Sequence, residues 1–181
     1  MKRVLCILEN GFEEIEVITP VDLLRRAGVE VVMAGVSGTE VTGKCGVKVG
    51  ADVLLADASV DGFDVLLLPG GPAVLALRGN PAVIGLIRQF HGDGKLIAAI
   101  CAAPLLLKDA GVLGDVNFTA HFSTAAELPD LVDARSVYDG KLLTSRGAGT
   151  ALEFGLALVG ILAGLKAKDE VAAAIMFDAA G

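Results

Sequence analysis

The chain of 181 residues has no tryptophan, one tyrosine, two histidines and three cysteines. The cysteines, at positions 6, 45 and 101, share no CxxC or other metal-binding spacing, so the sequence predicts no metal centre. Their odd number argues against a disulfide framework. We therefore expect free thiols, no metal and no cofactor.

A long hydrophobic run and an excess of basic residues are also missing. The longest apolar stretches, 96–107 and 154–165, are too short to span a bilayer. The apolar stretch at 4–8 is too short for the core of a signal peptide. The formal net charge of −7 repels phosphate backbones. These absences predict a cytoplasmic protein that binds neither a membrane nor nucleic acid directly.

Aliphatic residues are abundant by contrast. The hydrophobic fraction is 54% with only 4% aromatic residues, which suits parallel strands that are buried on both faces. The length fits a single domain over residues 1–181. The apolar content also suggests a surface that is hidden in a thick core or at a subunit interface.

Strand and helix patterns alternate along the chain. Strands are expected at 3–8, 29–35, 64–68, 95–100, 117–120 and 141–144, and an antiparallel excursion is expected at 37–60. Helices are expected between the turn at 9–11 and residues 25–28, at 81–91, after 101, at 150–165 and at 168–177. This alternation predicts an α/β fold with a parallel sheet covered on both faces. Ligands of such sheets bind at the carboxyl ends of the strands.

Cys101 follows the apolar strand 95–100 and precedes a helix with almost no loop between them. Such an elbow lifts the side chain above the sheet and points the first N–H groups of the helix at it, which favours the nucleophilic thiolate. The alternative is that Cys101 is only a packing residue, as a cysteine within an Ala/Ile/Leu run often is.

Glu16 is the acid that the helical period places with apolar neighbours. Phe12, Ile15, Glu16 and Thr19 share one stripe of the first helix, whereas Glu13 and Glu14 point elsewhere. A buried carboxyl tends to keep its proton, and beside a thiolate it could act as a general acid. The alternative is that the glutamates only favour the helix dipole.

A Pro-Gly-Gly-Pro turn at 69–72 ends another strand at the same edge of the sheet. It is either an ordinary turn or part of an oxyanion hole, in which the N–H of Gly70 or Gly71 and that of Ala102 would face Cys101. No GxGxxG motif or Walker lysine accompanies it, so nucleotide binding is not expected.

The two histidines differ in position. His91 lies at a helix end and is expected to be solvated. His121 follows the expected strand 117–120, which places it at the edge that carries Cys101. It is either a proton shuttle for that thiol or a structural residue.

Four motifs in order together closely resemble the ThiJ/PfpI superfamily, DJ-one branch. They are Glu13-Glu14-Ile15-Glu16, Leu68-Pro69-Gly70-Gly71, Ala98-Ala99-Ile100-Cys101-Ala102-Ala103-Pro104 and Leu143-Thr144-Ser145-Arg146-Gly147-Ala148-Gly149-Thr150. The resemblance implies a flavodoxin-like three-layer α/β/α sandwich, similar to class I glutamine amidotransferases, and a homodimer. It also implies a reactive cysteine paired with a protonated glutamate, at Cys101 and Glu16.

The resemblance further implies an enzyme that acts on small reactive carbonyls in oxidative or carbonyl stress. Glutathione-independent conversion of methylglyoxal or glyoxal, or removal of early glycation adducts, would begin with a hemithioacetal at Cys101. Ala102 replaces the histidine of the protease-like branch, so peptidase chemistry would lack its base. Neither His91 nor His121 begins the His-x-Glu pair of the amidotransferases.

Two other interpretations remain open from the sequence. In one, the protein is a redox sensor or chaperone whose Cys101 is oxidised to a sulfinate held by Glu16, with little turnover. In the other, it is a binding module in which Cys101 is an inert packing residue.

Overall fold

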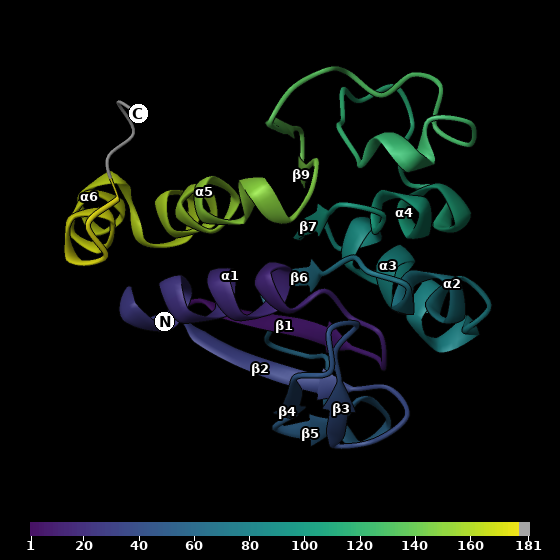
Figure 1. The fold of residues 1–181 in the computed structure, drawn as a ribbon, viewed down its shortest axis with the longest axis horizontal. Helices are drawn as coiled ribbons and strands as arrows, with labels where there is room; N and C mark the ends of the chain where they lie inside the picture. The colour runs from purple at the N-terminus through teal and green to yellow at the C-terminus, as the bar shows by residue number, and fades with distance from the viewer. Residues whose placement is uncertain (178–181) are drawn as a thin grey trace.

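A seven-stranded sheet forms the middle layer of the computed structural model, which describes residues 1–177 (Figure 1). In spatial order the strands are β5 (Val53–Leu54), β2 (Glu30–Gly35), β1 (Arg3–Leu8), β6 (Val65–Leu68), β7 (Leu96–Ile100), β9 (Leu142–Ser145) and β8 (Ser136–Asp139). Neighbouring strands are parallel except β8, which pairs antiparallel with β9. The predicted α/β fold with a mostly parallel sheet is confirmed.

Helices cover both faces of the sheet, which makes three layers (Figure 1). One face carries α1 (Glu14–Arg26), α5 (Ala151–Ala163) and α6 (Leu165–Ala174), and the other carries α2 (Ala73–Arg78), α3 (Pro81–Gly92) and α4 (Pro104–Ala110). Successive strand residues point to opposite faces, so β1 contributes Cys6 to the first core and Ile7 to the second. Among residues 1–177, no helix combines the length and apolar character needed to cross a membrane.

The expected antiparallel excursion is present as the hairpin of β3 (Glu40–Thr42) and β4 (Lys48–Gly50). The short elements β5 and α2 were not predicted. The prediction of a strand at 117–120 is wrong, because these residues do not pair with a strand of the sheet. Instead, the Thr119 N–H donates to the Thr144 hydroxyl at 3.0 Å and the Phe118 carbonyl accepts from Val132 at 2.9 Å. These contacts satisfy the backbone without strand pairing.

The adjacent parallel strands β1, β6 and β7 bring their following loops together at one edge of the sheet. Two backbone hydrogen bonds join the first two loops. The Gly11 carbonyl accepts from Ala73, and the Gly70 carbonyl accepts from Glu13, each at 3.2 Å. This junction places the start of α1 against the Pro-Gly-Gly turn.

Candidate active site

Cys101 lies in a strained turn between β7 and α4. Its φ of 66° is in the left-handed region, which is uncommon for a residue other than glycine. Backbone hydrogen bonds of 2.8 Å hold both sides of the turn, since the Cys101 N–H donates to the Ser145 carbonyl and the Cys101 carbonyl accepts from His121. The side chain is only partly buried. The structure therefore places this thiol where a small molecule can reach it.

Glu16 brings a carboxyl to this thiol from the first turn of α1, and it is fully buried. The side chain of Glu13 caps the helix by accepting the Glu16 N–H at 3.0 Å. Glu16 Oε2 accepts the Gly70 N–H at 2.9 Å, and the carboxyl also interacts with the Cys101 thiol. The predicted apolar stripe is narrower than expected, because Ile15 is 51% exposed.

Gly70 lies close to both the acid and the thiol. A Cβ on Gly70 would lie 2.6 Å from Cys101 Cβ and 2.7 Å from Glu16 Oε2, so any side chain there would displace one of them. Because the Gly70 N–H is already bonded to Glu16, it is not free to bind a substrate oxygen. The N–H groups of Gly71 and Ala102 face the Cys101 sulfur instead.

Burial and mutual interaction shape the titration of the Cys101–Glu16 pair. Burial raises the pKa of Glu16 to about 7. Burial and the Glu16 carboxylate raise the pKa of the Cys101 thiol to about 12, while the N–H groups of Gly71 and Ala102 lower it. The pair thus loses its first proton near pH 7 and resists losing the second. Its singly charged form is either thiol with carboxylate or thiolate with carboxylic acid.

This titration modifies the expectation that helix N–H groups alone favour the thiolate. In the structure the two N–H groups work against burial of the sulfur, and Glu16 decides the balance by holding or releasing its proton. Transfer of the thiol proton to Glu16 leaves the net charge of the pair unchanged, so it avoids the cost of burying a second charge.

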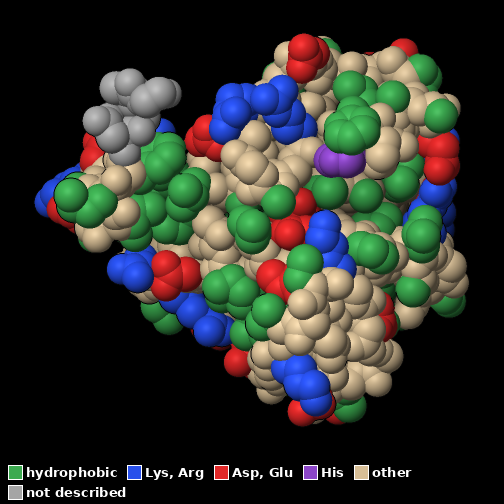
Figure 2. All heavy atoms as spheres, viewed as in Figure 1, with side chains coloured by type: hydrophobic (Ala, Val, Ile, Leu, Met, Phe, Trp, Pro, Cys, Tyr) green, Lys and Arg blue, Asp and Glu red, His purple; other side chains and the backbone are tan. Residues whose placement is uncertain are grey.

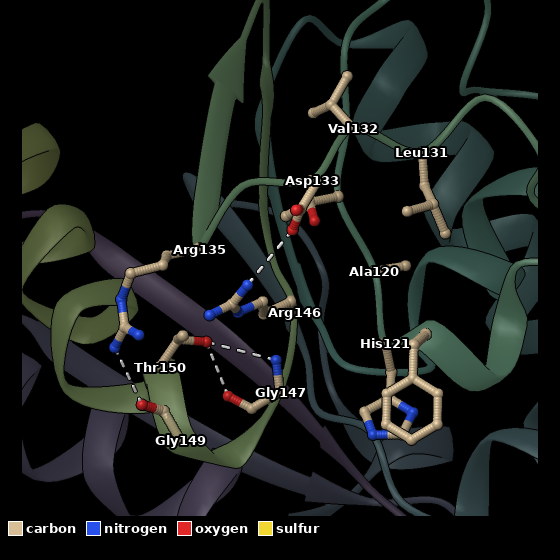
Figure 3. Close-up of a pocket in the computed structure, with 12 residues that line it drawn as sticks. Ala120, His121, Leu131, Val132, Asp133, Arg135, Arg146, Gly147, Gly149 and Thr150 are labelled. Atoms are coloured by element: carbon tan, nitrogen blue, oxygen red, sulfur yellow. Dashed lines mark hydrogen bonds and ion pairs between the residues drawn. The ribbon is translucent and has the colours of Figure 1, made fainter.

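His121 contacts Cys101 through its backbone, and its ring turns toward a neighbouring hollow (Figure 3). The Ser123 N–H donates to His121 Nδ1 at 3.3 Å, and the Ser123 hydroxyl lies 2.8 Å from the same atom. Because Nδ1 accepts from a backbone N–H, the neutral ring carries its proton on Nε2. The Phe122 ring lies against it, with 4.2 Å between the ring centroids.

The matching family model covers residues 2–160 and describes the DJ-1/PfpI family. The chain belongs to the DJ-1/PfpI family. It is 42% identical to the protein dj-1beta of Drosophila melanogaster over 97% of both chains. It is 35% identical to the glutathione-independent glyoxalase DJR-1.2 of Caenorhabditis elegans, covering 84% of this chain and 83% of the relative.

Solved structures of this family share the fold. The crystal structure of the Drosophila DJ-1beta protein has a TM-score of 0.92 at 40% identity, over 98% of each chain. An oxidised DJ-1 of Toxoplasma gondii has a TM-score of 0.93 at 32% identity, over 98% of this chain and 99% of that one. The resemblance noted from four motifs thus extends across the whole α/β sandwich.

The structure also adds residues to this family site that the sequence analysis did not single out. Ser145 accepts the Cys101 N–H, and the positive charge of Lys44 lowers the pKa of Glu16. Ser145 lies within the fourth motif, which was the available signal, whereas nothing local marks Lys44. Within residues 1–177, no group of three or more His, Cys, Asp and Glu side chains is arranged to hold a metal ion.

Proposed function

We propose that this DJ-1/PfpI family member is a cysteine-dependent, glutathione-independent glyoxalase that converts methylglyoxal to lactate and glyoxal to glycolate. The observation that carries the proposal is the buried Glu16 carboxyl beside the half-buried Cys101 thiol, with the N–H groups of Gly71 and Ala102 facing the sulfur. The nematode relative named as a glutathione-independent glyoxalase gives further support.

In the first step, the Cys101 thiol proton passes to the Glu16 carboxylate and the thiolate attacks the aldehyde carbon. A carbon–sulfur bond forms as the carbonyl electron pair moves to the oxygen. Glu16 gives its proton to this oxygen, which yields a hemithioacetal and restores the Glu16 carboxylate. The N–H groups of Gly71 and Ala102 are suited to stabilise negative charge that develops on this oxygen.

In the second step, Glu16 removes the proton from the former aldehyde carbon to give an enediol. Return of a proton to the neighbouring carbon gives a thioester of the 2-hydroxy acid. Water then breaks the carbon–sulfur bond, which releases the hydroxy acid and restores the thiol. The rearrangement needs no external oxidant, because the aldehyde carbon is oxidised while the neighbouring carbon is reduced. We assign His121 Nε2–H to proton transfer at the substrate oxygens.

The proposed substrate class includes early glycation adducts, which hold the same dicarbonyl carbon bonded to an amine or thiol. A reducing cytoplasm would keep Cys101 as a thiol.

We also propose a homodimer, since Ile15 and Ile18 of α1 are 51% and 44% exposed and Val47 of the hairpin is 51% exposed. Sedimentation of the wild type and of Ile18→Glu would test this, and a monomeric wild type would refute it.

The deciding experiment is lactate formation from methylglyoxal by the reduced protein without glutathione. We expect turnover in the wild type, none in Cys101→Ala and a loss of at least about a hundredfold in Glu16→Gln, the range typical of general acid–base groups. Cys45→Ser is the matched control, because Cys45 is an exposed thiol whose backbone N–H donates to Glu14 and to neither residue of the pair, and it should keep full turnover. Absence of turnover in the wild type would refute the glyoxalase.

A second function, redox sensing by oxidation of Cys101 with protection of client proteins, is favoured by one feature. Glu16 Oε1 is buried without a hydrogen-bond partner, and a protonated Glu16 could donate to a sulfinate oxygen. Two equivalents of peroxide convert the thiol to a sulfinate. Mass spectrometry should then find the sulfinate in the wild type and further oxidation in Glu16→Ala. A Cys101 that peroxide leaves unmodified would exclude this second function.

A further inference from the structure

A hollow of about 370 Å³ lies next to segments that hold the turn of Cys101 (Figure 3). It is lined by three segments of the chain, namely 119–122, 131–135 and 146–150. Two of them flank the reactive turn directly, because His121 donates to the Cys101 carbonyl and Ser145, which precedes Arg146, accepts the Cys101 N–H. Because the segments that hold the turn of Cys101 also contribute to the lining, a molecule bonded to Cys101 can extend toward the hollow.

Two guanidinium groups line the hollow, and they differ in how fully they are engaged. Arg135 is held by Glu153, whose Oε1 accepts from Nε at 2.8 Å and from Nη2 at 2.5 Å, and by the Gly149 carbonyl at 3.2 Å. Among residues 1–177, Arg146 makes one ion pair, at 3.4 Å, to an Asp133 side chain that is 99% exposed. Such an exposed single contact contributes little. Most donors of Arg146 thus remain available to an anion.

The surroundings of Arg146 favour an anion further. The hollow also includes Gly149 and Thr150 at the start of α5, where the positive end of the helix dipole attracts negative charge. Figure 2 shows Lys and Arg side chains gathered beside a histidine on this face, although the chain as a whole is acidic. Asp133 is the acidic side chain of the lining, and it points toward Arg146 (Figure 3).

We infer that this hollow is an anion subsite in which Arg146 binds the carboxylate or phosphate of an aldehyde substrate while Cys101 holds its carbonyl carbon. This rests on the proposed attack by Cys101 on carbonyls and adds, within that substrate class, a preference for small aldehydes with an acidic group over uncharged ones. Arg146 acts as a specificity-determining residue, since the chemistry itself belongs to Cys101 and Glu16.

The test compares two thiol reagents of nearly equal size, the anion iodoacetate and the neutral iodoacetamide. Mass spectrometry of the peptide that contains Cys101 gives the ratio of the alkylation rate with iodoacetate to the rate with iodoacetamide. In Arg146→Gln this ratio should fall by roughly threefold to tenfold, the effect of removing one charge at short range in a partly screened site. Arg146→Lys should keep part of the preference, because it keeps the charge and loses the planar fork.

Two controls separate this effect from a change in overall charge. Lys166→Gln removes one positive charge from α6, where the side chain is 91% exposed, and should leave the ratio at Cys101 unchanged. The ratio at exposed Cys45 in the same sample should not change in Arg146→Gln. A ratio at Cys101 that is equal in the wild type and Arg146→Gln would overturn the inference.

The nature of the acidic group is tested by protection. Inorganic phosphate and acetate are titrated separately against alkylation of Cys101 by iodoacetamide, and the one that protects at lower concentration identifies the preferred group. Protection that persists in Arg146→Gln would overturn the assignment to Arg146. Alkylation requires no turnover, and methylglyoxal carries no charge. Failure of the anion subsite and failure of the glyoxalase are thus seen in different experiments.

Discussion

Gly70 donates its N–H to Glu16 Oε2 at 2.9 Å, while its missing side chain leaves room for the Cβ of Cys101. One residue thereby fixes the acid by hydrogen bonding and admits the thiol by its small size. The pairing of acid and thiol depends on this glycine as much as on the two reactive side chains.

Gly70→Ala should disturb both stability and reactivity. The added Cβ would lie 2.6 Å from Cys101 Cβ, so the turn must shift, and we expect a loss of about 1–3 kcal/mol in the free energy of unfolding. Alkylation of Cys101 should change in the same variant. Gly85→Ala is the matched control, because nothing lies within 4 Å of a Cβ there. In this α3 position alanine should stabilise by about 0.5–1 kcal/mol, and equal effects at both sites would contradict the steric argument.

The rate of Cys101 alkylation should rise with pH around pH 7. The Cys101–Glu16 pair loses its first proton there, because burial raises the pKa of Glu16 to about 7 and the singly charged pair includes the thiolate form. Iodoacetamide kinetics between pH 5 and 10, followed on the Cys101 peptide, measure this profile. A single rise near the ordinary thiol value of about 8.5 would show that the proton stays on sulfur.

Glu16→Gln should stabilise the fold in a pH-dependent way. Its folded pKa is about 7 instead of 4.5, so the unfolded chain ionises first as pH rises and wild-type stability is lost between these values. The stability difference between Glu16→Gln and wild type should therefore grow by about 3 kcal/mol from pH 4.5 to 7.5. Urea denaturation at several pH values measures it.

Glu14→Gln provides a control of opposite sign for that experiment. Desolvation raises the pKa of Glu14, but hydrogen bonds from its own backbone N–H and from those of Cys45 and Val47 outweigh it, so the pKa is lowered overall. The Glu14 carboxylate therefore stabilises the fold above pH 4.5, and this stabilisation is lost as pH falls through the lowered pKa. A rising difference for both variants would indicate a general charge effect instead of burial of Glu16.

His121→Gln should separate proton transfer from thiol activation. The backbone N–H of residue 121 still holds the Cys101 carbonyl in this variant, so the alkylation rate of Cys101 should stay within about threefold of wild type. Loss of the Nε2 proton donor should lower kcat for methylglyoxal by about a hundredfold. An unchanged kcat would leave His121 with only a structural role.

The sequence by itself determined the layered fold. Runs such as Val65–Leu68 and Leu96–Ile100 are continuously apolar, which is the pattern of parallel strands buried on both faces, and the intervening helical periods set the alternation. The Cys101 elbow and the Gly-Gly turn could also be predicted from the sequence, because each is marked by local residues next to the end of a strand. The prediction of a strand at 117–120 failed because polar and apolar residues alternate there as in a strand, whereas its hydrogen-bond partners are a side chain and a distant loop.

Only the tertiary structure decided how these local signals interact. Helical spacing placed Glu16 on the same stripe as Ile15, yet Glu16 is fully buried and Ile15 is half exposed, because the Gly70 turn covers only part of the helix surface. The pKa of Glu16 and the use of the Gly70 N–H also depend on contacts between residues 54 positions apart. Sequence patterns report local conformation and average burial, whereas desolvation and hydrogen-bond partners arise only when distant segments pack together.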